Sequence, residues 1–204
     1  MKIGIMGGTF DPIHNGHLML GEHAYKTYHL DQVWFVPNGN PPHKLAKTIQ
    51  SDLTDRMEMV SLAIAKQPYF KLSSCEAKRD GISYSYETME RLSLLYPDDE
   101  FYFIMGADSL YAIESWKNFE RLLTVCTILA ACRDGVKAEE MMERIDYLNA
   151  EYQADVRLLT APLQDISSHE IRERVKSKQS IEGIVPQAVR EYIEDLSLYE
   201  ERRR

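Results

Sequence analysis

Two histidines stand three residues apart near the start of the chain, in a run that also contains two adjacent glycines. His14 and His17 follow Gly7 and Gly8, and Gly16 lies between the two histidines. On a helix, residues three apart project from the same face, so both imidazoles would point toward one site. Adjacent glycines let the backbone approach a ligand closely, and the first turn of a helix offers unpaired amide groups that attract anions. The run therefore predicts a phosphate-binding loop.

Other interpretations of this histidine pair account for less of the run. Structural histidines would fit an isolated H-x-x-H but would leave the glycines unexplained. A metal site lacks a third ligand at a suggestive spacing and also lacks the glutamate of H-E-x-x-H. The glycines do not fit G-x-G-x-x-G, and no G-x-x-x-x-G-K-[ST] occurs in the chain. We therefore expect no protein-held metal.

The elements that must position this loop alternate along the chain. Short β-branched or aromatic runs lie at Lys2–Met6, Gln32–Val36, Phe70–Cys75, Phe101–Met105, Val125–Ala131 and Val156–Leu159. Helical patterns lie between them at about 15–28, 54–67, 85–95, 115–123 and 137–152. This alternation predicts an α/β fold, a doubly wound Rossmann-like parallel sheet. Such sheets bind ligands beyond the carboxyl ends of their strands.

The C-terminal part changes to two successive helices, expected at roughly 168–178 and 186–196. No repeat, low-complexity tract or Gly/Ser linker interrupts the chain. We therefore expect a single domain over residues 1–204, with the C-terminal helices packed on the same core.

Charge and cysteine usage limit the function classes. With 24 basic and 32 acidic side chains, the net charge is −8, which disfavours binding to nucleic acid. Cys75, Cys126 and Cys132 are odd in number and lack paired spacing, as in a protein of the reducing cytoplasm. The longest apolar stretch, 122–132, is too short to cross a bilayer, so we expect no membrane partner. The oligomeric state, a homo-oligomer included, stays open.

The run from Gly7 to His17 resembles the G-G-T-F-D-P-x-H-x-G-H signature of the bacterial nicotinate mononucleotide adenylyltransferases, within the wider H-x-G-H nucleotidyltransferase superfamily. Further segments similar to motifs of this family are P-P-H-K at 41–44, G-A-D at 106–108, S-W-x-x-F at 115–119 and I-S-S-H-E-I-R at 166–172. The resemblance covers about residues 1–195. It implies transfer of the adenylyl group of ATP to nicotinate mononucleotide, giving nicotinate adenine dinucleotide and pyrophosphate, a step in NAD biosynthesis.

The resemblance also implies roles for individual residues on the ATP side. The residues placed at the reacting phosphates are His14, His17, Lys44 and Arg172. The histidines would face the α-phosphate, and the two cations would bind the β- and γ-phosphates. Further residues expected to bind ATP are Gly7, Gly8, Thr9, Phe10, Gly16, Gly106, Asp108, Ser167 and Ser168. Asp108 could instead cap a helix, and Ser167 with Glu170 forms a capping box that is compatible with anion binding. A Mg²⁺ ion carried by ATP would neutralise further charge.

On the acceptor side, the residues expected to bind nicotinate mononucleotide are Asn38, Ser85, Trp116, Lys117 and Arg133. The flat indole of Trp116 would stack on the pyridine ring. The chain departs from the family at several of these motifs. Where this chain has Ser85 and Lys117, the family commonly has threonine and an aromatic residue. Where it has Asp134 and His169, the family motifs have proline and threonine. These departures leave the fine geometry of the acid pocket open.

The implied reaction needs no general base, because the attacking 5′-phosphate, with a second pKa of about 6, is largely dianionic at neutral pH. The sequence accordingly contains no paired nucleophile and base among its motifs. The alternatives are another H-x-G-H transferase, acting on nicotinamide mononucleotide or a pantetheine phosphate or transferring a cytidylyl group, and a non-catalytic nucleotide-binding sensor.

Overall fold

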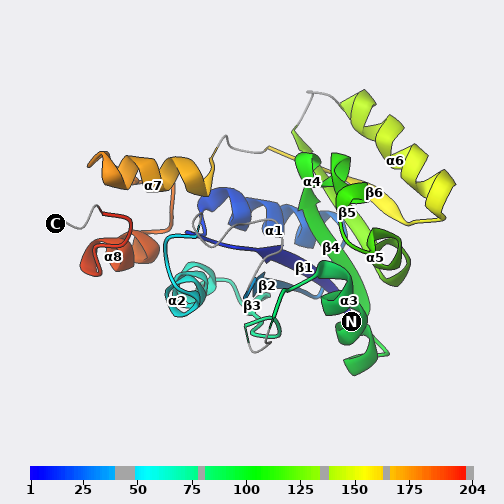
Figure 1. Cartoon of the computed structure of the whole chain (residues 1–204), viewed down its shortest axis with the longest axis horizontal. Helices are drawn as coiled ribbons and strands as arrows, with labels where there is room; N and C mark the ends of the chain where they lie inside the picture. The colour runs from blue at the N-terminus through cyan, green and yellow to red at the C-terminus, as the bar shows by residue number, and fades with distance from the viewer. Residues whose placement is uncertain (40–48, 78–80, 134–137, 163–165, 201–204) are drawn as a thin grey trace.

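The computed structural model of the chain describes residues 1–39, 49–77, 81–133, 138–162 and 166–200. It contains a six-stranded parallel sheet in the order β3-β2-β1-β4-β5-β6 (Figure 1). The strands are β1 (Lys2–Gly8), β2 (Gln32–Pro37), β3 (Phe70–Leu72), β4 (Glu100–Gly106), β5 (Thr127–Arg133) and β6 (Val156–Ala161). The strand order reverses at β1 and β4, which is where doubly wound sheets bind their ligands. The predicted fold class is confirmed.

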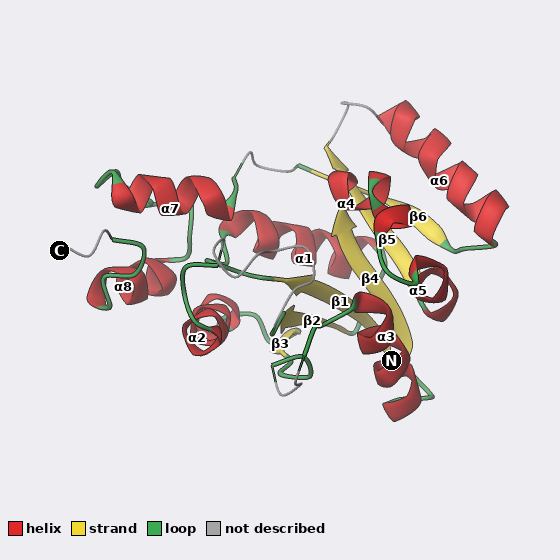
Figure 2. Cartoon of the chain, viewed as in Figure 1, coloured by secondary structure: helices red, strands yellow, loops and turns green. Residues whose placement is uncertain are grey.

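Helices cover both faces of the sheet (Figure 2). The helices that contribute to the apolar cluster on one face are α1 (Asn15–Thr27), α2 (Leu53–Ile64), α7 (Ser168–Lys176) and α8 (Gln187–Asp195). The helices that contribute to the cluster on the other face are α3 (Ser85–Leu95), α4 (Ala107–Tyr111), α5 (Phe119–Val125) and α6 (Ala138–Tyr152). Among the described residues, no helix has the length and apolar character needed to cross a membrane.

Alternation along the central strands supplies both clusters. In β4, Ile104 belongs to the cluster under α1 and α2, whereas Phe103 belongs to the cluster under α3 and α5. In β1, Met6 and Ile5 divide in the same way. Successive strand residues point to opposite faces, so a sheet covered on both sides needs apolar residues at consecutive positions.

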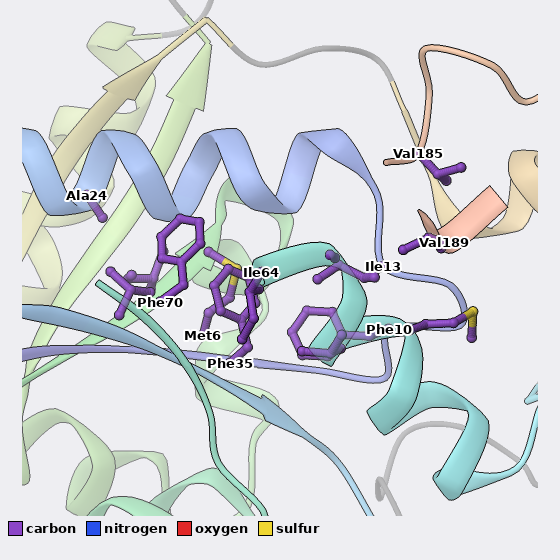
Figure 3. Packing of buried hydrophobic residues seen from close by; sticks show 14 of the residues in the cluster. Met6, Phe10, Ile13, Ala24, Phe35, Ile64, Phe70, Val185 and Val189 are labelled. Carbon is purple, nitrogen blue, oxygen red and sulfur yellow. The ribbon is translucent and has the colours of Figure 1, made fainter. Parts of the chain in front are cut away.

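The C-terminal helices pack on the cluster that also contains the loop after β1. Figure 3 shows Val185 and Val189 close to Ile13 and Phe10. All four side chains are at least 95% buried. Segments from the two ends of the chain therefore build one wall of the same core.

The chain from β4 to β5 differs from the prediction of one helix at 115–123. A short α4 is followed by a 3-10 helix, η2 (Ile113–Ser115), and α5 begins only at Phe119. Asn118 separates them with a left-handed backbone (φ 53°), a conformation that asparagine tolerates better than most residues. Because α5 continues to Val125, strand β5 begins at Thr127 and not at the predicted Val125. The predicted strand Phe70–Cys75 is also shorter, and ends at Leu72.

Candidate active site

A cleft opens beyond the carboxyl ends of β1, β2 and β4. It consists of two hollows of about 350 and 230 Å³ that share five lining residues: His17, Asn38, Ser85, Ser109 and Trp116. We call the two together the switch-point cleft, because it lies where the strand order reverses. Two wider hollows elsewhere, near Asp155 and near Lys71, are more open and contain no residue of the sequence motifs.

Most of the residues predicted to bind substrate line this cleft. They are Gly7, Gly8, Thr9, Phe10, His17, Asn38, Ser85, Gly106, Trp116, Lys117 and Ser168. These residues come from six separate parts of the chain, and the parallel sheet brings them to one edge. The convergence places the glycine loop and the tryptophan on the same hollow, as a substrate spanning both would require.

His17 lies on the wall of the cleft and is held there by His14. The two imidazole centroids are 3.7 Å apart with an interplanar angle of 31°. The backbone N–H of His14 donates a hydrogen bond of 3.3 Å to Nδ1 of His17. With Nδ1 as an acceptor, the neutral His17 ring carries its proton on Nε2, the nitrogen that can donate to an anion. The spacing predicted from the sequence thus brings the rings together.

His14 lies behind His17 and is only 6% exposed. Burial lowers the pKa of His14 to about 4, so its ring is neutral at physiological pH. Its Nδ1 is buried and has no hydrogen-bond partner among the described residues. A Cβ at Gly16 would lie 3.0 Å from that nitrogen, so glycine at this position makes room for the His14 ring.

The Phe10 ring also packs against His17. It lies edge-on to the His17 imidazole, with the ring centroids 5.1 Å apart, and the residue is 2% exposed. A Cβ at Gly8 would come within 3.0 Å of the Phe10 ring, which explains a glycine at that position independently of any ligand. Phe10 itself has a left-handed backbone (φ 51°), a costly conformation for an aromatic residue. Packing against His17 is therefore a clear role of Phe10, and its contact with ATP stays a prediction.

Arg56 of α2 ties the loop after β1 to the loop after β2, and sequence reasoning missed it. Its Nη1 donates to the backbone oxygens of Thr9, at 2.8 Å, and Asn38, at 2.9 Å. The residue is 2% exposed, and burial lowers the pKa of its guanidinium. A signal was present, because Arg56 precedes Met59 and Val60 by three and four residues and so shares their apolar helix face.

The start of α7 attaches to the same loop. Ser168 donates from Oγ to the backbone oxygen of Pro12 at 2.9 Å, and Arg172 donates from Nη1 to the backbone oxygen of Asp11 at 2.6 Å. Ser167 caps the helix by accepting from the backbone N–H of Glu170 at 3.1 Å. Ser168 lines the cleft, whereas Ser167 and Arg172 do not. The phosphate contacts predicted for those two residues stay predictions.

The opposite end of the cleft is built from the segment before α3 and the segment before α5. The half-buried Trp116 lies edge-on to Phe103, with centroids 6.4 Å apart and an interplanar angle of 89°. Lys117 is exposed, and its Nζ lies 4.7 Å from the centroid of the Tyr84 ring. Ser83 Oγ and Asn38 Oδ1 are buried and lack hydrogen-bond partners among the described residues. Within the described lining of the larger hollow, Lys117 is the one lysine, arginine or acidic residue.

Three other predicted residues stand apart from the cleft or outside the description. Asp108 is exposed in the first turn of α4, whose N-cap is Gly106, and it does not line either hollow. Lys44 lies outside the described residues, as does the side chain of Arg133 at the end of β5. Their roles stay predictions.

The described residues contain no group of three or more His, Cys, Asp or Glu side chains suited to hold a metal ion. Asp11, which belongs to the loop after β1, is 2% exposed and already accepts hydrogen bonds from Ser51 and Tyr199. The Mg²⁺ ion expected to arrive with ATP stays a prediction.

Comparison with known proteins shows the family and the fold of the chain. Residues 5–174 match the model of the cytidylyltransferase-like family. A probable nicotinate-nucleotide adenylyltransferase of Lachnoclostridium phytofermentans is 44% identical over 94% of this chain and 96% of its own. A probable nicotinate-nucleotide adenylyltransferase of Clostridium novyi is 38% identical over 97% of this chain and 98% of its own. The Plasmodium falciparum nicotinic acid mononucleotide adenylyltransferase complexed with NaAD has the same fold, with a TM-score of 0.79 at 22% identity over 97% of both chains.

Proposed function

This chain belongs to the nicotinate-nucleotide adenylyltransferases within the cytidylyltransferase-like family, and we propose that it transfers the adenylyl group of ATP to nicotinate mononucleotide. The products are nicotinate adenine dinucleotide and pyrophosphate, so the reaction is a step in NAD biosynthesis. The observation that carries the proposal is the pair of contacting imidazoles after β1, one of which, His17, lines the cleft that also contains Trp116.

The chemical difficulty of this reaction is electrostatic. The 5′-phosphate of the acceptor, with a second pKa of about 6, is already a nucleophile at neutral pH, so no base must activate it. The enzyme must instead bring two polyanions together and stabilise the charge that develops on the α-phosphate and on the leaving pyrophosphate. Preorganised N–H donors do this best, because they need not reorient as the charge develops.

His17 is the side chain best placed to donate to the α-phosphate. Its Nδ1 accepts from the backbone N–H of His14, so the neutral ring carries its proton on Nε2, and the residue lines both hollows of the cleft. His14 is neutral in the free protein because burial lowers its pKa to about 4. A nearby phosphate dianion would favour the protonated ring, so binding would raise that pKa. The pair would then supply positive charge only when substrate is present.

The triphosphate of MgATP is proposed to extend from the glycine loop toward α7. Ser168 lies on the cleft at the start of that helix, where backbone N–H groups favour an anion. Lys44 and Arg172 are the cations proposed to bind the β- and γ-phosphates, as the family resemblance implies. Mg²⁺, bound with ATP, would neutralise part of the remaining charge.

The pyridine ring of the acceptor is proposed to stack on Trp116, with Ser85 beside it. The ammonium of Lys117 reaches the same hollow and is its one ionic side chain among the described residues. A cation here favours the carboxylate of nicotinate over the neutral amide of nicotinamide. Lys117 thus supports the acid form of the mononucleotide as the acceptor.

The cytoplasm is the proposed location of the protein. Cys75, Cys126 and Cys132 are all free thiols in the structure, and a reducing compartment suits unpaired cysteines. Fractionation of cells with an antibody to the chain would test this point.

The test of the proposed function is incubation of the purified protein with MgATP and one acceptor at a time. The acceptors are nicotinate mononucleotide, nicotinamide mononucleotide and pantetheine phosphate, with pyrophosphate release and the adenylylated product both quantified. We expect the highest kcat/KM with nicotinate mononucleotide. A preference for another acceptor would overturn the substrate assignment, and MgATP binding without turnover on any of the three would favour a nucleotide sensor.

A further inference from the structure

The segment after α8 returns to the loop that carries the signature histidines. Tyr199 is 7% exposed, and its hydroxyl donates to Oδ1 of Asp11 at 2.8 Å. The same hydroxyl lies 3.2 Å from Oγ of Ser51. Asp11 stands three residues before His14, so a residue near the end of the chain contacts the loop that forms the phosphate site.

Asp11 is the centre of this contact. Besides Tyr199, its carboxylate accepts from the backbone N–H of Gln50 at 2.9 Å and from Oγ of Ser51 at 2.5 Å. The Arg172 guanidinium lies 3.8 Å from the other carboxylate oxygen. A buried carboxylate is stable only when it is hydrogen-bonded and paired in this way. Because its acceptor positions are used internally, Asp11 holds the loop in place and does not act on the substrate.

The backbone of the same loop holds α7. The carbonyl of Asp11 accepts from Arg172, and the carbonyl of Pro12 accepts from Ser168 on the wall of the cleft. The position of Asp11 therefore sets the position of the helix start proposed to bind the triphosphate. The pyridine end of the cleft, with Trp116, is built from other elements.

The backbone around Tyr199 indicates that its placement is more than incidental packing. Ser197 and Tyr199 both have left-handed φ angles, of 50° and 67°. Non-glycine residues adopt this region only when surrounding contacts compensate for the strain. Here the compensation includes the hydroxyl contact to Asp11, which a phenylalanine of the same shape could not make.

We propose that Tyr199 is a positioning residue for ATP, acting through the carboxylate of Asp11 on the loop and on the start of α7. The inference rests on the proposed function, since it takes this end of the cleft to bind the triphosphate. It assigns the C-terminal segment a role in substrate affinity that is separate from the acceptor site.

The test is Tyr199→Phe in the full-length protein, which removes one oxygen atom. We expect the KM for ATP to rise about fivefold, whereas kcat and the KM for nicotinate mononucleotide stay within twofold, because the loop and α7 lose a restraint and the pyridine end does not. The matched control is Tyr192→Phe. Tyr192 also joins the C-terminal helix to α2, donating to Oδ1 of Asp55 at 2.9 Å, but it does not contact Asp11. The control should leave all three constants unchanged.

A second variant separates positioning from folding. Ser51→Ala removes another hydroxyl from the same oxygen of Asp11 and should produce the same ATP-selective effect. The double variant should raise the KM for ATP by less than the product of the two single effects, because contacts to one carboxylate are coupled.

Equal rises in the KM values for ATP and nicotinate mononucleotide, or a Tyr192→Phe effect as large as that of Tyr199→Phe, would overturn the inference. If Tyr199→Phe proves unstable in a thermal melt, an unchanged KM for ATP in Ser51→Ala overturns it. Lack of adenylyl transfer by the unsubstituted protein would instead count against the proposed function.

Discussion

The two ends of the switch-point cleft are built differently: the one proposed to bind the phosphates, the phosphate end, and the one proposed to bind the pyridine ring, the pyridine end. At the phosphate end, His14 and Asp11 are almost fully buried. The Arg56 guanidinium donates hydrogen bonds to the carbonyls of two loops there. At the pyridine end, Lys117 is exposed and Trp116 is half-buried. Each end contains a buried polar atom without a partner among the described residues, which is His14 Nδ1 at the phosphate end and the Ser83 hydroxyl at the pyridine end.

In the proposed function, this contrast separates catalysis at one end of the cleft from recognition of the ring at the other. Stabilising a developing charge requires donors that are fixed before the reaction, which buried hydrogen bonds provide. Recognition of a planar ring needs one broad apolar surface and a few polar groups around it, and these can vary without disturbing the fold. The chain differs from the family pattern at Ser85 and Lys117, at the pyridine end, and also at His169 in the first turn of α7, whereas both signature histidines are present.

The largest expected effect is at the phosphate end. His17→Ala should lower kcat by about a hundredfold or more, because a well-placed electrostatic donor contributes roughly 3 kcal/mol to the transition state. His23→Ala is the matched control, since His23 lies on the same helix and does not line the cleft, and it should leave kcat unchanged. Steady-state kinetics measures kcat for both variants. Near-normal turnover by the His17 variant would show that this histidine does not stabilise the transition state.

The burial of His14 predicts a pH-dependent stability. Its folded pKa of about 4 lies below the unfolded value of about 6.5, so the unfolded chain takes up a proton first as the pH falls. From pH 6.5 down to about 4, His14 should therefore cost the fold about 3 kcal/mol, and the loss should level off below that range. Urea unfolding at pH 7 and pH 4.5 measures the difference, which should be smaller in His14→Gln. An identical pH dependence in the variant would show that His14 is not the group responsible.

At the pyridine end, the larger effect is expected from the indole. Trp116→Ala should raise the KM for nicotinate mononucleotide about tenfold, since stacking on an aromatic side chain contributes about 1–3 kcal/mol. The KM for ATP should change by less than twofold. Equal changes in the two KM values would argue against ring stacking and against the division of the cleft into two ends.

The smallest effect is expected from Lys117. Lys117→Met should reduce the preference for nicotinate over nicotinamide mononucleotide about fivefold, a change of about 1 kcal/mol, because an exposed ion pair is weakened by solvent. Lys117→Arg keeps the charge and should keep the preference. If both variants discriminate as the unsubstituted protein does, the carboxylate is recognised by other groups.

The sequence predicted well those features that local pattern determines. Alternating strand and helix signals gave the parallel sheet, and the spacing of His14 and His17 was enough to place their rings on one side of the helix start. The residues missed are those whose role depends on long-range contacts. In the sequence, Arg56 is an arginine in a helical segment and Tyr199 is a residue near the C-terminal end. Only the fold brings Arg56 to Thr9 and Tyr199 to Asp11.

Local backbone conformation explains the error between β4 and β5. An apolar pattern over 115–123 favours one helix, but the left-handed Asn118 separates η2 from α5. That interruption leaves Trp116 and Lys117 in a non-helical segment on the wall of the cleft. The position of both residues at the pyridine end depends on it.

The central claim, that one cleft holds the reacting phosphates at the histidine pair and the pyridine at Trp116, is tested most directly by a crystal structure with nicotinate adenine dinucleotide bound. The account predicts the adenylyl phosphate within hydrogen-bond distance of His17 Nε2 and the pyridine ring parallel to the Trp116 indole. A dinucleotide bound in another hollow, or bound with its phosphates away from both imidazoles, would contradict it.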